Sequence, residues 1–209
     1  MVVAAAGVVV FAAAAAAPVV VGPPAAGEFR SVTMLTRRQL LRLVDAPAVE
    51  AAIARAESRT SAEIRVALAP FFWGSIRDTA ERAFVRLGIG STRAHNGVLI
   101  FLVPSRRGLA VIGDAAIHAV VGAAFWTEVC GRLETSFRAG RYTEGLVAAI
   151  ELLGIRLGPS FPVDPAGDRN ELPNAVVVVD HIAQSSPQPE EVGADPAPGL
   201  GPRRATMRT

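Results

Sequence analysis

The stretch that decides the fold is HNGVLIFLVPSRRGLAVIGDAAIHAVVG, residues 95–122. Residues 98–103 form a continuous apolar run, which is typical of a central strand covered on both faces. A five-residue turn, PSRRG, then leads into residues 109–112, so the sequence predicts a β-hairpin. Asp114 follows as the predicted N-cap of a helix, and Gly122 marks the end of that helix.

Upstream of this hairpin the pattern alternates between helix and strand. Asp45 is the predicted N-cap of a first helix. Residues 63–68 alternate apolar and polar side chains, which predicts a strand with one buried face and with Glu63 and Arg65 facing solvent. Residues 76–87 carry an apolar stripe at helical spacing and predict a second helix.

Downstream, two further apolar stripes predict helices that end near Gly140 and Gly158. Residues 176–179 predict a short edge strand. The resulting order, α-β-α-β-β-α-α-α, predicts an α/β fold in which a small mixed β-sheet is sandwiched between helices. Gly113, at a junction of strand and helix, indicates a special backbone angle or a close contact.

The composition excludes several classes of function. Among 209 residues, 51% are hydrophobic and 19% are charged, which is typical of a globular chain. The 21 basic residues are all arginine and are spread along the chain, so the sequence predicts no nucleic-acid surface. No phosphate-binding loop is present, so no nucleotide cofactor is expected. The single cysteine, Cys130, excludes an internal disulfide and a cysteine metal site, and its apolar neighbours predict a core position.

The chain divides into three segments. Residues 1–33 are rich in Ala and Val, and three interpretations stay open: a signal peptide, an uncleaved membrane anchor, or a misassigned start with translation from Met34. Residues 34–173 form the predicted α/β domain. Residues 174–209 form a Pro-rich tail that is expected to be largely disordered.

Five motifs connect this chain to a known family. They are EAAIARAESRTSAEIRV (50–66), HNGVLIFLV (95–103), IGDAAIHAVVG (112–122), FWTEV (125–129), and FP with NELP (161–162 and 170–173). The set resembles the TPM domain family, whose members include thylakoid-lumen phosphatase-like and photosystem-repair proteins, and it is most similar to the short bacterial branch. The resemblance implies the α/β sandwich fold.

The resemblance also implies two kinds of function. The first is a non-catalytic, membrane-linked adaptor or assembly module that binds a protein partner and a divalent cation. The second is a metal-assisted acid phosphatase that acts on phosphate monoesters. The sequence favours the adaptor because it contains no nucleophile motif and no dense acidic cluster. The expected location is a membrane, reached through residues 1–33, or the cytoplasm if translation starts at Met34.

A small set of polar residues makes up the candidate site. Asp114 and His118 are four residues apart on the predicted helix and form a candidate acid–base pair. Calcium is the candidate cation, with Asp114, Glu63, Asn96 and Asp78 as candidate oxygen ligands because each borders a strand or its loop. The alternative interpretation is structural, with Asp114 as a helix cap and Asn96 as a turn residue.

Overall fold

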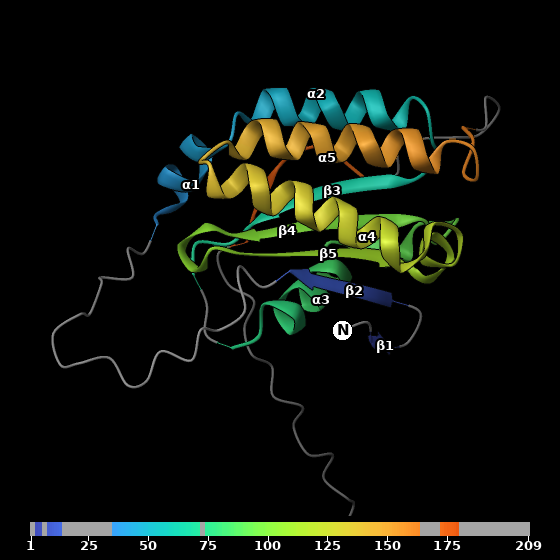
Figure 1. The fold of residues 1–209 in the computed structure, drawn as a ribbon, viewed down its shortest axis with the longest axis horizontal. Coiled ribbons are helices and arrows are strands. Elements are labelled where there is room, and N and C mark those ends of the chain that lie inside the picture. The colour runs from blue at the N-terminus through green and yellow to red at the C-terminus, as the bar shows by residue number, and fades with distance from the viewer. Residues whose placement is uncertain (1–2, 6–7, 14–34, 72–73, 164–171, 180–209) are drawn as a thin grey trace, which may run out of the picture.

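Helices cover both faces of one β-sheet, which confirms the predicted α/β class. This computed structural model describes residues 3–5, 8–13, 35–71, 74–163 and 172–179. Its helices are α1 (Arg37–Leu43), α2 (Ala46–Glu57), α3 (Ile76–Arg86), α4 (Ala115–Arg138) and α5 (Tyr142–Leu157). Helices α2, α4 and α5 lie over one face of the sheet, and α3 lies under the other (Figure 1). None of the described helices is both long and apolar enough to cross a membrane.

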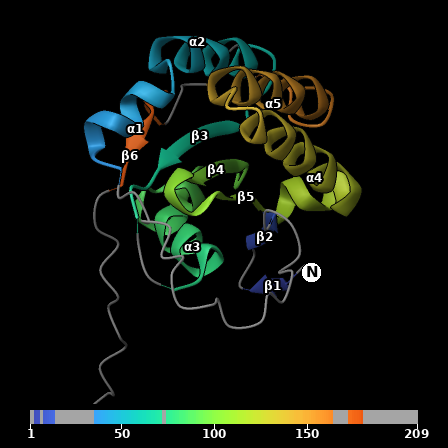
Figure 2. The same ribbon diagram turned by 60° about the vertical axis from the view of Figure 1, so that its left-hand side comes forward.

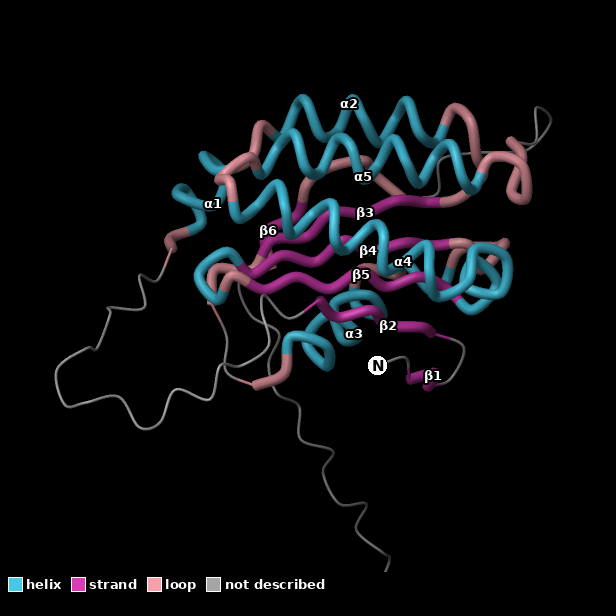
Figure 3. The backbone as a smooth tube through the Cα atoms, in the orientation of Figure 1, coloured by secondary structure: helices cyan, strands magenta, loops and turns pink. Residues whose placement is uncertain are grey.

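The sheet is mixed, as predicted, and its strands run in the order β1-β2-β5-β4-β3-β6 (Figure 3). The strands are β1 (Val3–Ala5), β2 (Val8–Ala13), β3 (Glu63–Leu68), β4 (Gly97–Val103), β5 (Gly108–Asp114) and β6 (Val177–Val178). Strands β3 and β4 are parallel, and β4 and β5 are antiparallel. Every residue of β4 is buried, which confirms the predicted central strand.

The predicted hairpin is confirmed between β4 and β5. A short 3-10 turn, Pro104–Arg106, leads into Arg107, whose φ of 49° lies in the left-handed region. Val103 then pairs with Gly108 and Val98 pairs with Gly113. Because β5 returns along β4, its last residue lies beside the first residue of β4 at one end of the sheet.

The helices contain one element that was not predicted and one predicted helix end that takes the form of a kink. An additional helix, α1, precedes α2 because Thr36 and Gln39 form a capping box: each side chain accepts a hydrogen bond from the other residue's backbone N–H. Gly122 interrupts α4 at the position where the sequence predicts a helix end. It adopts φ 71° and ψ 175° and makes a kink, beyond which the helix continues to Arg138.

Two apolar clusters hold the layers together. The larger lies between the sheet and α2, α4 and α5 and contains Ile64, Trp126 and Cys130. The smaller lies on the α3 face and contains Phe84 and Phe101. Each fully buried residue of this size contributes roughly 2 kcal/mol of hydrophobic stabilisation. The predicted core position of Cys130 is confirmed, and burial raises the pKa of its thiol to about 12.

Strand β3 departs from the prediction of one solvent-facing side. All of its residues are buried, and Glu63 and Arg65 are each only 5% exposed. The physical reason is that the sheet is covered on both faces, so the polar side of this strand also lies inside the protein. The predicted edge strand at residues 176–179 is confirmed as β6, which pairs in parallel with β3.

Part of the N-terminal segment also joins the sheet. Strand β2 pairs antiparallel with β5, and β1 pairs antiparallel with β2. Residues 14–34, which belong to the segment with three open interpretations, lie outside the described residues, as do residues 180–209 of the predicted tail.

Candidate functional site

Asp114 occupies the junction between β5 and α4. Its position is the N-cap of α4, as predicted, but its side chain makes no capping hydrogen bond. The backbone N–H of Gly97 donates to Asp114 Oδ2 at 2.9 Å. The predicted side-chain cap is therefore wrong, because the carboxylate turns across the sheet to the first N–H of β4. This hydrogen bond joins two neighbouring strands at their ends.

Burial sets the electrostatics of Asp114, which is 5% exposed. Burial raises the pKa of its carboxyl above the usual range, while the Gly97 hydrogen bond and the charge of His95 act in the opposite direction. The Asp114–His118 pair stays a prediction, and the histidine whose charge acts on this carboxylate, His95, precedes β4 in the chain.

Asn96 and Glu63 lie at the same end of the sheet as Asp114. The N–H of Glu63 donates to the carbonyl of Asn96 at 3.3 Å. The side-chain Nδ2 of Asn96 donates to the carbonyl of Ser61 at 2.6 Å and contacts its Oγ at 3.3 Å. Asn96 is 2% exposed, so its amide fastens the loop before β4 to the loop before β3.

Asp78 does not join this group. It is an exposed residue in the first turn of α3, and that helix starts at the opposite end of the sheet, beside the β4–β5 turn. Arg106 Nη1 of that turn donates to the carbonyl of Gly74 at 2.6 Å, which fixes the start of α3 there. The predicted set of four ligands is therefore divided between the two ends of the sheet. Among the described residues, no three His, Cys, Asp or Glu side chains are grouped to hold a metal ion.

Glu57, at the C-terminal end of α2, was missed by the sequence analysis. Its Oε1 accepts the N–H of Ile64 at 3.0 Å. Burial, together with the charge of Glu63, raises the pKa of Glu57 to about 7, although hydrogen bonds from Ile64 and Asn174 and the charge of Arg65 lower it. No sequence signal marks this residue, because its environment is created by the contact of α2 with β3.

A hollow of about 320 Å³ opens beside Glu57. It is lined by Ala54, Glu57, Ser58, Thr60, Ser61, Ala62, Glu63, Val163 and Asn174. Arg65 follows Glu63 by two residues in the sequence. Its Nε and Nη1 are buried without a hydrogen-bond partner among the described residues. Burial lowers the pKa of Arg65, and the charges of Glu57 and Glu63 favour its protonated form. The hollow thus combines two carboxyl groups with hydroxyl and amide groups.

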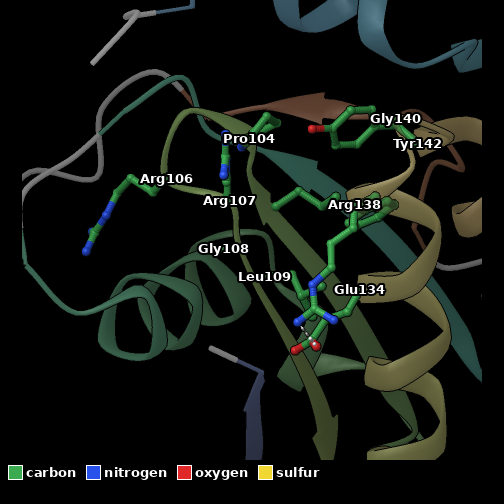
Figure 4. Close-up of a pocket in the computed structure, with 11 residues that line it drawn as sticks. Pro104, Arg106, Arg107, Gly108, Leu109, Glu134, Arg138, Gly140 and Tyr142 are labelled. Atoms are coloured by element: carbon green, nitrogen blue, oxygen red, sulfur yellow. Dashed lines mark hydrogen bonds and ion pairs between the residues drawn. The ribbon is translucent and has the colours of Figure 1, made fainter. Parts of the chain in front are cut away.

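A larger groove, of about 620 Å³, lies at the other end of the sheet, between the β4–β5 turn and the α4–α5 connection. Its lining is Leu102, Pro104, Arg106, Arg107, Gly108, Leu109, Glu134, Phe137, Arg138, Gly140 and Tyr142. The rings of Phe137 and Tyr142 are stacked with centroids 5.0 Å apart. Figure 4 shows Arg138 directed toward Glu134, with which it forms a 3.0 Å ion pair, and Arg106 extended away from the groove.

Comparisons with known proteins agree with this architecture. Residues 35–155 match the TPM domain family model. Among solved structures, the NMR structure of the BA42 protein from the psychrophilic bacterium Bizionia argentinensis is 32% identical, with a TM-score of 0.61. The match covers 66% of this chain and 94% of that one. No curated protein matches. The family match spans more than half of the chain, so this protein belongs to the TPM domain family.

Proposed function

We propose that this TPM domain is a non-catalytic adaptor that holds an acidic segment of a partner protein in the groove beside the β4–β5 turn. The observation that carries the proposal is the lining of the groove. It contains more arginines than glutamates, and it includes the stacked rings of Phe137 and Tyr142. Arginine and tyrosine, together with tryptophan, are enriched among the residues that dominate binding energy at protein interfaces. An acidic segment with an apolar side chain complements both properties.

The use of Asp114 supports an adaptor over an enzyme. Asp114, the candidate acid–base carboxylate of the sequence, accepts a backbone hydrogen bond and is almost fully buried. A general acid or base must reach the proton that it transfers, directly or through one water. Asp114 instead stabilises the end of the sheet, which is a structural task.

A matched pair of variants tests this proposal. Arg138 and Arg132 lie on the same helix, have side chains 58% exposed, and each forms an ion pair with the glutamate four residues before it. Of these two residues, only Arg138 lines the groove. The probe is a fluorescein-labelled peptide, Asp-Glu-Phe-Asp-Glu-Leu, titrated at low and moderate salt. Arg138→Gln should weaken binding by up to about fivefold, the upper end of what one exposed ion pair contributes. Arg132→Gln should leave binding unchanged. Equal effects of the two variants, or no binding, would refute the groove as the partner site.

The membrane link is part of the same proposal and rests on the apolar residues 1–33. Because Val8–Ala13 is paired with β5 in the folded chain, membrane association through these residues requires them to leave the sheet. Flotation with phospholipid vesicles compares the full chain with one that starts at Met34. We expect only the full chain to float, and flotation of both would place the membrane contact elsewhere.

A metal-assisted phosphatase is the second candidate, and the hollow beside Glu57 is the observation that favours it. Two carboxyl groups line this hollow, and a pKa of about 7 suits Glu57 for proton transfer near neutrality. A divalent cation would be held there by carboxylate, hydroxyl and amide oxygens. Hydrolysis of p-nitrophenyl phosphate with calcium or magnesium is the test. Turnover that Glu57→Gln abolishes would rank the enzyme above the adaptor.

A further inference from the structure

The outer edge of β5 is completed by residues that precede the family domain. The TPM family match begins at residue 35, whereas β2 ends at Ala13. Within residues 35–155, β5 pairs on one side with β4. Its other side pairs with β2. The domain by itself therefore has an open β-edge, and the N-terminal segment fills it. Open edges are places where another chain can add a strand.

Strand β2 pairs with β5 along its whole length. Six residues of β2 pair antiparallel with six of β5, from Val8 opposite Asp114 to Ala13 opposite Leu109. Helix α4 contacts this strand from one side of the sheet and α3 contacts it from the other (Figure 2). The sequence VVVFAA suits such a position, because a strand covered on both faces is apolar throughout and rich in β-branched residues.

We propose that the β5 edge is a strand-acceptor site, with Val8–Ala13 as its built-in occupant, and that release of β2 opens the site to an extended Val- and Ala-rich segment of another protein. Recognition combines a backbone hydrogen-bond ladder with apolar side chains inserted beside α3 and α4. This site goes beyond the proposed groove, because its ligand is an apolar strand rather than an acidic segment.

The built-in strand also controls access to the site. A tethered segment acts at an effective concentration in the millimolar range, so it outcompetes a free strand of similar intrinsic affinity. Binding of a partner strand therefore requires β2 to be released or removed. An N-terminal segment that is cleaved, inserted in a membrane or not translated would leave the site open.

Disulfide cross-linking tests the position of β2 in the full chain. All variants carry Cys130→Ser, so that the two introduced cysteines are the only ones. Ala12→Cys with Ala110→Cys joins two residues that are opposite each other in the register. Val10→Cys with Ala110→Cys is the matched control, out of register by two residues on the same strand. Mild oxidation should close the first pair within one chain at least tenfold faster than the second. Equal rates of disulfide formation in the two pairs, or disulfide-linked dimers, would contradict the assignment of β2 as the built-in occupant.

Peptide binding tests the acceptor itself. The probe is the sequence of residues 7–14, GVVVFAAA, with two added lysines at each end and a fluorophore. Its receptors are the cross-linked chain and a full chain with Val10→Pro and Phe11→Pro. Because adjacent N–H groups of a strand point to opposite edges, the two prolines remove at least one hydrogen bond to β5.

We expect the double-proline chain to bind the probe at least tenfold more tightly than the cross-linked chain. A probe with proline at the same two positions should bind neither chain. Circular dichroism melts confirm that the double-proline chain is folded, and hydrogen exchange should show faster exchange along residues 108–114 in that chain. The proposal would be overturned if the folded double-proline chain did not bind the probe. It would also be overturned if the hydrogen-exchange protection of β5 were the same as in wild type. These results do not depend on the acidic probe, so the groove and the strand site can fail separately.

Discussion

Substitution of Gly113 is expected to destabilise the protein through one specific contact. A Cβ atom added at this position would lie 2.7 Å from Cζ2 and 2.8 Å from Cη2 of Trp126. Carbon atoms in contact are normally about 3.5 to 4 Å apart, so the indole ring or the strand must move by close to 1 Å. Trp126 is fully buried in the larger apolar cluster, so its ring has little room to shift.

The expected magnitude follows from the cost of overfilling a core. Such substitutions cost typically 1–3 kcal/mol, and the gain from replacing glycine in the unfolded chain offsets up to about 1 kcal/mol of this. We expect Gly113→Ala to lower the free energy of unfolding by about 2 kcal/mol, which corresponds to a fall in Tm of about 4 to 8 °C. Gly113→Val carries a larger side chain and should cost more.

Urea unfolding followed by circular dichroism measures this effect. Gly131→Ala is the control, because Gly131 lies in α4 and a Cβ atom there meets no atom within 4 Å. That variant should be as stable as wild type or more so, since alanine favours a helix over glycine. In a Trp126→Phe background the cost of Gly113→Ala should fall by about 1 kcal/mol, because the two sites are coupled. If Gly113→Ala is as stable as Gly131→Ala, the close contact with Trp126 is refuted.

Three further predictions follow from buried polar groups and the thiol. Asp114→Asn retains an oxygen that accepts the Gly97 N–H, so its free energy of unfolding should stay within about 1 kcal/mol of wild type. Calcium should have the same effect on the Tm of wild type and of Asp114→Asn. A calcium-dependent shift that is lost only in Asp114→Asn would contradict a purely structural role for Asp114. Between about pH 4.5 and 7 the folded chain holds a proton on Glu57 that the unfolded chain has lost, so stability falls as pH rises through this window. Urea unfolding at pH 5 and pH 8 should show that the free energy of unfolding falls less in Glu57→Gln than in wild type. An equal fall in the two proteins would contradict the raised pKa of Glu57. Cys130→Ser should lower Tm by a few degrees without changing binding of the acidic peptide, because the buried thiol lies outside the groove; weaker binding by a normally folded variant would contradict this.

Local patterns were sufficient to predict the hairpin and most helices. The apolar run at residues 98–103 and the short turn after it define β4 and β5, because both depend on residues close in sequence. Gly113 was also recognisable, since a glycine between a strand and a helix indicates a special angle or a close contact. The structure shows that the contact, with Trp126, is the reason.

Features that depend on distant residues could not be predicted in this way. Arg65 alternates with apolar residues and therefore resembles a solvent-facing position, but the second face of the sheet is also covered. Asp78 and Asp114 both border strands, and only the three-dimensional path of α3 places them at opposite ends. Glu57 acquires its raised pKa from the neighbouring strand, which no local pattern contains.

The most direct test of the adaptor is an NMR titration of the uniformly labelled full chain with the peptide Asp-Glu-Phe-Asp-Glu-Leu. The account predicts chemical-shift changes concentrated at residues 102–109 and 134–142, which include the lining of the groove. It also predicts that Arg138→Gln reduces these changes and that Arg132→Gln does not. Changes centred instead on Glu57, Glu63 and Ser61 would contradict the groove as the partner site and favour the hollow at the other end of the sheet.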